Sequence, residues 1–144
     1  MSPIQIEVLD PIKLPLVSRL YKTYYPSGKA KKDELILVGY FENQLTSVVR
    51  LRSVDQYRLL TGMMVIPEYR DKGFGHQMMS YCEERVLTNQ DFCFAYQHLE
   101  SFYSQHGFRI LEIQQLPNSL KNLFERYSRT KKLVPMQYTS HSSN

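Results

Sequence analysis

The sequence predicts a mixed α/β fold of the α+β type, built around one mixed, mostly antiparallel sheet of about six to seven strands. Two observations predict it. Short runs with strand-like patterns dominate the first half of the chain, and helix-like and strand-like segments alternate in the second half. With 144 residues and a 42% hydrophobic composition, the chain is long and apolar enough to bury a core. We therefore expect a single domain over residues 1–139 and a disordered tail over residues 140–144.

The first half reads as a short strand, a helix and three longer strands. The helix is indicated by apolar residues at helical spacing, followed by a Pro-Ser-Gly break. Two apolar runs on either side of Glu42-Asn43-Gln44 are typical of a β-hairpin. The expected elements are a strand at Ile4–Val8, a helix at Ile12–Tyr25, hairpin strands at Glu34–Phe41 and Leu45–Arg52, and a strand at Tyr57–Ile66.

The hydrophobic period changes from two to about 3.6 at Phe74, where a long helix is expected to begin. Its predicted buried face carries Phe74, Met78, Met79, Cys82 and Val86. The later elements are a central strand at Phe92–Tyr96, a short helix at His98–His106 ended by Gly107, a strand at Phe108–Ile113, a helix at Pro117–Arg129 and a strand at Leu133–Tyr138. Pro135 should confine the last strand to a sheet edge or a bulge.

Composition limits the classes of function without choosing one. The net charge of +4 and the pI near 9.0 favour anionic partners such as nucleic acid, an acidic membrane or a polyphosphate cofactor. No helix-turn-helix or aromatic RNA-binding signature is visible, and the N-terminus has no sustained apolar run, so we expect neither nucleic-acid binding nor membrane insertion. Cys82 and Cys93 indicate buried or half-buried thiols in a reducing cytoplasm, and the four histidines show no metal-ligand spacing.

The stretch VIPEYRDKGFGHQMM, residues 65–79, places glycines between a strand and a helix. Helix N-termini carry a partial positive charge, and glycine lets a ligand approach the backbone closely, so such a turn can hold phosphate oxygens beside Arg70 and Lys72. A plain strand-to-helix turn explains Gly73 and Gly75 equally well. A Walker A loop is excluded because His76-Gln77 follows the glycine, and a dinucleotide fingerprint is excluded by the bulky Met78.

Two motifs in the right order resemble the GNAT superfamily of acyl-CoA-dependent N-acyltransferases. The resemblance covers roughly residues 35–113. The first motif, Val-x-Pro-x-x-Arg-x-x-Gly-x-Gly, follows a strand, and the second, Phe-Tyr-x-x-x-Gly-Phe, follows the next strand. The matching residues are Val65, Pro67, Arg70, Gly73 and Gly75 for the first motif, and Phe102, Tyr103, Gly107 and Phe108 for the second.

The resemblance implies that acetyl-CoA is the co-substrate and that no metal is needed. It implies that the pyrophosphate of the cofactor sits on the backbone of the glycine turn. The pantetheine arm would pair with the strand before the turn, in a sheet that splays between that strand and Phe92–Tyr96. The implied cofactor-binding residues are Met64, Val65 and Ile66 for the arm, and Arg70, Asp71, Lys72, Gly73, Phe74, Gly75 and His76 for the phosphates.

The resemblance also implies that Tyr103 is the general acid that protonates the departing thiolate. A phenol is protonated at neutral pH, and the alternative is that the ring packs against the cofactor or the core and donates nothing. Many relatives carry a glutamate base on the strand before the turn, but Leu59–Val65 holds no carboxylate. His98 is the nearest candidate base, with a satisfied, partly buried histidine as the alternative. Tyr96 replaces an asparagine that the family often has.

The function so implied is N-acetylation of a primary amine by direct attack on acetyl-CoA. The alternative is a non-catalytic, regulatory acyl-CoA-binding domain. The acceptor would be a small-molecule or peptide amine, and a homodimer, common in the family, is left open. Tyr21, Tyr24 and Tyr25 lie where relatives build the acceptor wall, or simply pack a helix on the sheet. The helix at Pro117–Arg129 would cap the acceptor mouth or form a dimer contact.

Overall fold

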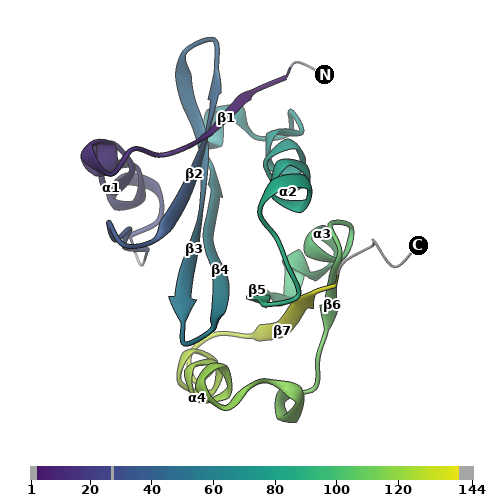
Figure 1. The fold of residues 1–144 in the computed structure, drawn as a ribbon. Coiled ribbons are helices and arrows are strands. Elements are labelled where there is room, and N and C mark those ends of the chain that lie inside the picture. Colours follow the sequence, from purple (N-terminus) through teal and green to yellow (C-terminus); the bar gives the residue numbers. More distant parts are fainter. Residues whose placement is uncertain (1–2, 27, 140–144) are drawn as a thin grey trace. The chain divides into compact units, whose positions relative to one another are not determined.

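A computed structural model describes residues 3–26 and 28–139, so the predicted tail at 140–144 lies outside the described part. The chain divides into two compact units. Among the described residues, 3–26, 28–52 and 61–81 form unit 1, and 53–60 and 82–139 form unit 2. The strand β4 (Tyr57–Val65) and the helix α2 (Phe74–Arg85) each contribute residues to both units. Figure 1 traces the elements along the chain.

Unit 1 contains β1 (Gln5–Val8), α1 (Leu14–Tyr24), β2 (Leu35–Phe41), most of β3 (Gln44–Val54), the end of β4 and the start of α2. The strands β2 and β3 form the predicted hairpin. Its two turn residues, Glu42 and Asn43, have φ of 50° and 65°, which is the backbone of the two-residue turns that match strand twist. The strand β1 pairs with β2 in antiparallel register, from Gln5–Tyr40 to Val8–Leu37.

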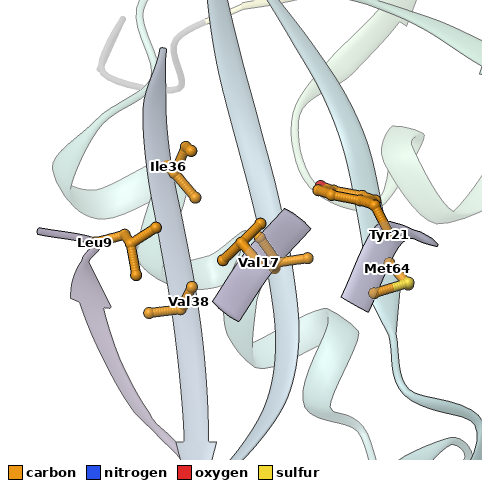
Figure 2. Close-up of a cluster of buried hydrophobic side chains, with 7 residues drawn as sticks. Leu9, Val17, Tyr21, Ile36, Val38 and Met64 are labelled. Carbon is orange, nitrogen blue, oxygen red and sulfur yellow. The ribbon is translucent and has the colours of Figure 1, made fainter. Parts of the chain in front are cut away.

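Helices cover both faces of the strands of unit 1. Buried side chains of α1 pack with those of β2, β3 and β4 in one cluster, which Figure 2 shows. On the opposite face of β2, a Cβ on Gly39 would lie 2.8 Å from Ile4 Cδ1 and 3.4 Å from Met78 Cε of α2. The cluster on the α1 face consists of Leu9, Val17, Tyr21, Ile36, Val38, Val48 and Met64.

Unit 2 contains the start of β4, β5 (Asp91–Tyr96), α3 (Glu100–Ser104), β6 (Phe108–Ile110), α4 (Asn118–Tyr127) and β7 (Leu133–Tyr138). The apolar face of α4 packs on β4 and β5, as its helical spacing predicts. This core consists of Leu59, Phe92, Leu111, Leu116, Leu120, Leu123 and Phe124. The predicted helix at His98–His106 is a 3-10 turn at Gln97–Leu99 followed by α3.

The seven strands are hydrogen-bonded in the order β1-β2-β3-β4-β5-β7-β6, which confirms the mixed α/β prediction. The pairing of β4 with β5 is parallel and runs from Arg58–Asp91 to Leu60–Cys93. The pairings of β7 with β5 and with β6 are antiparallel. The strand predicted at Phe108–Ile113 ends early, at Ile110, because Ile113–Gln115 folds into a 3-10 turn capped by Glu112.

The prediction that Pro135 confines β7 to an edge or bulge is wrong, because β7 lies between β5 and β6. The Leu111 amide donates to the Pro135 carbonyl at 2.9 Å. In an antiparallel strand the N and O atoms of one residue face the same neighbour, so the missing N–H of Pro135 faces the segment just beyond the last residue of β6. The proline therefore costs one bond at the end of a ladder and leaves the pairing with β5 intact.

Candidate functional site

The turn between β4 and α2 has the backbone of an anion-binding loop. After β4 ends at Val65, a 3-10 turn at Pro67–Tyr69 leads to Asp71 and Gly73, whose φ angles are 64° and 80°. A left-handed residue followed by a right-handed helix points successive N–H groups toward one concave site, the arrangement called a nest. Gly73 adopts this conformation immediately before the first residue of α2, Phe74.

Hydrogen bonds hold the two ends of this turn. The Ile66 amide donates to the Thr46 carbonyl of β3 at 2.8 Å, and Arg70 Nε donates back to the Val65 carbonyl at 3.1 Å. At the helix, the Gln77 amide donates to the Gly73 carbonyl at 3.0 Å. The amides of Phe74 and Gly75 come before this first i to i−4 bond, so they have no intrahelical acceptor.

Apolar side chains anchor the turn and leave its charged residues at the surface. Phe74 is buried, with its ring 5.3 Å from that of Phe41 and 6.3 Å from that of Tyr69. Met64 and Ile66 are buried as well, so the cofactor contact expected from them is one of backbone. The side chains of Arg70, Asp71, Lys72 and His76 are exposed, and Gly73 and Gly75 are half-buried.

These features suit a negatively charged ligand at the turn. The concave backbone, the helix N-terminus, and the exposed Arg70 and Lys72 all favour an anion at this turn. All the predicted cofactor-binding residues, from Met64 to His76, lie in unit 1 and in one continuous stretch of chain.

The candidate acid, Tyr103, lies in unit 2 on α3 and is 6% exposed. Its ring makes edge contacts with those of Phe102 and Phe108, at centroid distances of 5.1 and 5.8 Å. The motif residue Gly107 has φ of 87° and ends the segment after α3, as predicted. The Phe-Tyr motif therefore forms a packed aromatic group between α3 and β6.

The candidate base, His98, is exposed and lies in the 3-10 turn after β5. Its ring stacks on that of Tyr96, with centroids 5.8 Å apart and planes inclined by 28°. An open depression of about 350 Å³ lies here, lined by Tyr96, Gln97, His98 and Lys132. The alternative of a partly buried histidine is wrong, since the imidazole is open to solvent.

A buried polar cluster in unit 1 was missed by the sequence reasoning. Tyr21 of α1, 1% exposed, donates from its hydroxyl to the Gly62 carbonyl of β4 at 2.6 Å. Arg50 of β3, 5% exposed, pairs with Glu34 at 2.9 Å. Burial raises the pKa of Tyr21 despite the nearby Arg50 guanidinium, so its hydroxyl remains a donor. Two features of the sequence could have indicated this cluster: Gly62 lies inside a predicted strand, and Arg50 lies within an apolar strand.

The tyrosines of α1 divide between core and surface. Tyr21 packs in the core on the sheet, whereas Tyr24 is 42% exposed. Tyr25 lies just after the helix and is half-buried, with its ring 6.0 Å from that of Tyr21. The lysines of the following loop, Lys29, Lys31 and Lys32, are exposed. Tyr21 therefore packs the helix on the sheet, which is one of the two alternatives for these tyrosines.

Both cysteines are buried free thiols, as predicted. Among the described residues, no group of three or more His, Cys, Asp or Glu side chains is placed to hold a metal ion. No helix in the described ranges 3–26 and 28–139 is long and apolar enough to cross a bilayer.

Comparison with known proteins defines the class. The sequence profile of the acetyltransferase (GNAT) domain matches residues 32–110, which is more than half of the chain. The chain therefore belongs to the GNAT acetyltransferase family. No curated protein sequence matches it.

Solved acetyltransferase structures share the fold. The N-acetylglutamate synthase of Neisseria gonorrhoeae, complexed with coenzyme A and N-acetyl-glutamate, aligns over 98% of this chain with a TM-score of 0.76 and 12% identity. This chain spans only 36% of that enzyme. The ribosomal-protein-S18-alanine N-acetyltransferase of Escherichia coli aligns over 99% of this chain and 97% of its own, with a TM-score of 0.63 and 12% identity.

A third structure has a bound cofactor. The PaiA N-acetyltransferase of Thermoplasma acidophilum, in complex with coenzyme A, aligns over 96% of this chain and 99% of its own. Its TM-score is 0.61 and its identity is 14%. At such identities these likenesses establish the fold.

Proposed function

We propose that this protein is an N-acetyltransferase that moves the acetyl group of acetyl-CoA to a primary amine. The observation that carries the proposal is the turn between β4 and α2, whose left-handed Gly73 and helix N-terminus form a phosphate-binding backbone within the matched family domain. The coenzyme A named in the neighbouring structures supports the same co-substrate.

In this proposal the turn binds the two phosphates and the strand before it binds the pantetheine arm. The Phe74 and Gly75 amides donate to phosphate oxygens, and Arg70 and Lys72 supply charge. The backbone of Met64–Ile66 pairs with the amide groups of the arm. Because Met64 and Ile66 bury their side chains in unit 1, this stretch of backbone is firmly anchored beneath the ligand.

The reaction is a direct transfer. The neutral amine nitrogen attacks the thioester carbonyl carbon, a C–N bond forms, the C–S bond breaks, and the amine loses a proton while the thiolate gains one. We assign the proton donor to Tyr103, because a phenol enters the reaction protonated at neutral pH. Its buried ring, packed against those of Phe102 and Phe108, suits a donor that must hold one direction.

The amine proton would leave through His98 or through water. His98 is open to solvent beside the depression with Tyr96 and Lys132, so its imidazole can exchange protons with bulk water. The depression offers an aromatic face and one cation to the acceptor. An acceptor with a carboxylate next to its amine, such as a free amino acid, would suit Lys132 better than a polyamine.

The alternative is a regulatory domain that binds acyl-CoA without turnover. The absence of a carboxylate from Leu59–Val65 and the presence of Tyr96 where relatives often have asparagine favour this alternative. Tight binding of acetyl-CoA, with no acetylated product from any amine class, would establish it.

The test is ligand-dependent stability followed by turnover. Thermal unfolding would be compared with acetyl-CoA, CoA and NAD, each at a hundred times an expected dissociation constant. Binding adds about 2.7 kcal/mol to stability at that ratio, which is a shift of about 5–10 °C for a domain of this size. A shift with acetyl-CoA and CoA but not NAD supports the site, and mass spectrometry of amine mixtures then identifies acetylated products. No shift at millimolar acetyl-CoA would refute the proposal.

A further inference from the structure

Gly62 lies in the middle of β4 and has a φ of 64°, a left-handed conformation that departs from extended strand backbone, and we call this departure the Gly62 kink. Left-handed glycines inside strands mark bulges, where the chain is re-aimed. From the geometry around this residue we infer that Tyr21 and Arg50 are positioning residues, which hold the backbone at Gly62 and thereby fix the following segment, Met64–Ile66, for acyl-CoA. The inference rests on the proposed function of that backbone.

Tyr21 fixes the orientation of one peptide group. Its hydroxyl donates to the Gly62 carbonyl at 2.6 Å, and its ring is held in the core of α1 and the sheet (Figure 2). Because a trans peptide is planar, the N–H of Met63 points opposite to the Gly62 carbonyl. The bond from Tyr21 therefore sets the direction of the Met63 amide as well as that of the carbonyl.

Arg50 closes the space above the kink. Its Cζ lies 4.9 Å from the centroid of the Tyr21 ring, and its Nη1 donates to the Lys29 carbonyl as well as to Glu34. Its Nε is, among the described residues, a buried polar atom with no hydrogen-bond partner. A Cβ on Gly62 would come within 2.7 Å of that Nε and 2.6 Å of the Tyr21 hydroxyl, so any other residue here would displace Arg50 or Tyr21 and would also strain a backbone with φ of 64°.

The segment after the kink is thus held at both ends. Gly62 is fixed by Tyr21, and the Ile66 amide is fixed by the Thr46 carbonyl at 2.8 Å. Between these two anchors lie Met63, Met64 and Val65. A buried arginine Nε without a hydrogen-bond partner lowers the free energy of unfolding, and an apolar side chain could fill the same space without that cost. The close approach of this arginine to Gly62 agrees with a positioning role.

The test is Tyr21→Phe, which removes one hydroxyl and keeps the ring. The matched control is Val17→Ala, on the same helix and in the same core cluster but without a contact to the kink through a polar atom. Calorimetric titration would give the dissociation constants of CoA and of ADP, which carries a pyrophosphate without the pantetheine arm. Thermal unfolding would confirm that both variants are folded.

We expect Tyr21→Phe to weaken CoA binding by roughly three- to tenfold, because loss of one hydrogen bond lowers the fraction of molecules whose β4 backbone is in the binding conformation. ADP binding should be unchanged. Val17→Ala should leave both affinities unchanged. Equal CoA affinity in wild type and Tyr21→Phe would overturn the inference while leaving the proposed function intact. Failure of wild-type protein to bind CoA would instead remove the proposed function, and the inference with it.

Discussion

Replacement of Gly73 by alanine tests the phosphate turn at its most constrained residue. The φ of 80° at Gly73 is one that an L-residue adopts only at a cost of about 1–2 kcal/mol. The alanine variant must either keep this backbone and lose that stability, or relax toward negative φ and move the amides of Phe74 and Gly75. A lost charge-assisted hydrogen bond is worth about 1.5–3 kcal/mol, so CoA affinity should fall roughly ten- to hundredfold in the second case.

The assay pairs urea unfolding with calorimetric titration of CoA. Asp71→Gly is the matched control, because Asp71 is a non-glycine residue with φ of 64° in the same turn. The Asp71→Gly substitution relieves backbone strain, so the free energy of unfolding should not fall appreciably. It also removes a negative charge near the phosphates, so CoA affinity should not fall either. A Gly73→Ala variant with wild-type stability and wild-type affinity would refute the argument from backbone geometry. Lost stability with unchanged affinity would refute only the phosphate contact.

Three further predictions concern unit 2. Tyr103→Phe should lower kcat by roughly 10²-fold or more at unchanged CoA affinity, and an unchanged rate in single-turnover kinetics would remove the acid role. Arg58→Ala should cost about 3 kcal/mol in urea unfolding, because it removes the guanidinium bound to the fully buried Asp91 at 2.7 Å and leaves that carboxylate with the Thr88 amide; a loss below about 1 kcal/mol would contradict this. Burial, reinforced by the Asp91 charge, raises the pKa of Cys82 from 9.0 to about 12. Because the folded protein keeps the Cys82 thiol neutral while the unfolded chain ionises it above pH 9, the contribution of this thiol to the free energy of unfolding is full below pH 9. It is lost as the pH rises toward 12, by up to about 1.4 kcal/mol per pH unit. Cys82→Ala should flatten that slope between about pH 9 and 11, and an identical slope would exclude the thiol as its source.

Much of the fold follows from local sequence patterns. The period change at Phe74 locates the start of α2, and the turn Glu42-Asn43 locates the hairpin, because helix faces and tight turns depend on residues close together in the chain. The glycine turn is likewise a local motif, so the left-handed Gly73 is where the sequence motif leads one to expect it.

The position of β7 within the sheet could not be predicted from local sequence patterns. Whether Pro135 sits at an edge depends on which strand lies beside it, and the partner Leu111 is supplied from elsewhere in the chain. The cluster of Tyr21, Arg50 and Gly62 has the same character, since its three residues are brought together from α1, β3 and β4. Contacts between distant segments leave weak traces in any one stretch of sequence.

The insertion of β7 between β5 and β6 also constrains the order of events in folding. The strands β5 and β6 precede β7 in the chain but pair with it on either side, so neither pairing can form before Leu133–Tyr138 is available. Such nonlocal pairing is slow, and the unpaired edges of β5 and β6 are exposed in the meantime. The sheet of unit 2 is therefore complete only once β7 has paired on both sides, and we expect mutations that weaken β7 to increase aggregation during synthesis before they change the native protein.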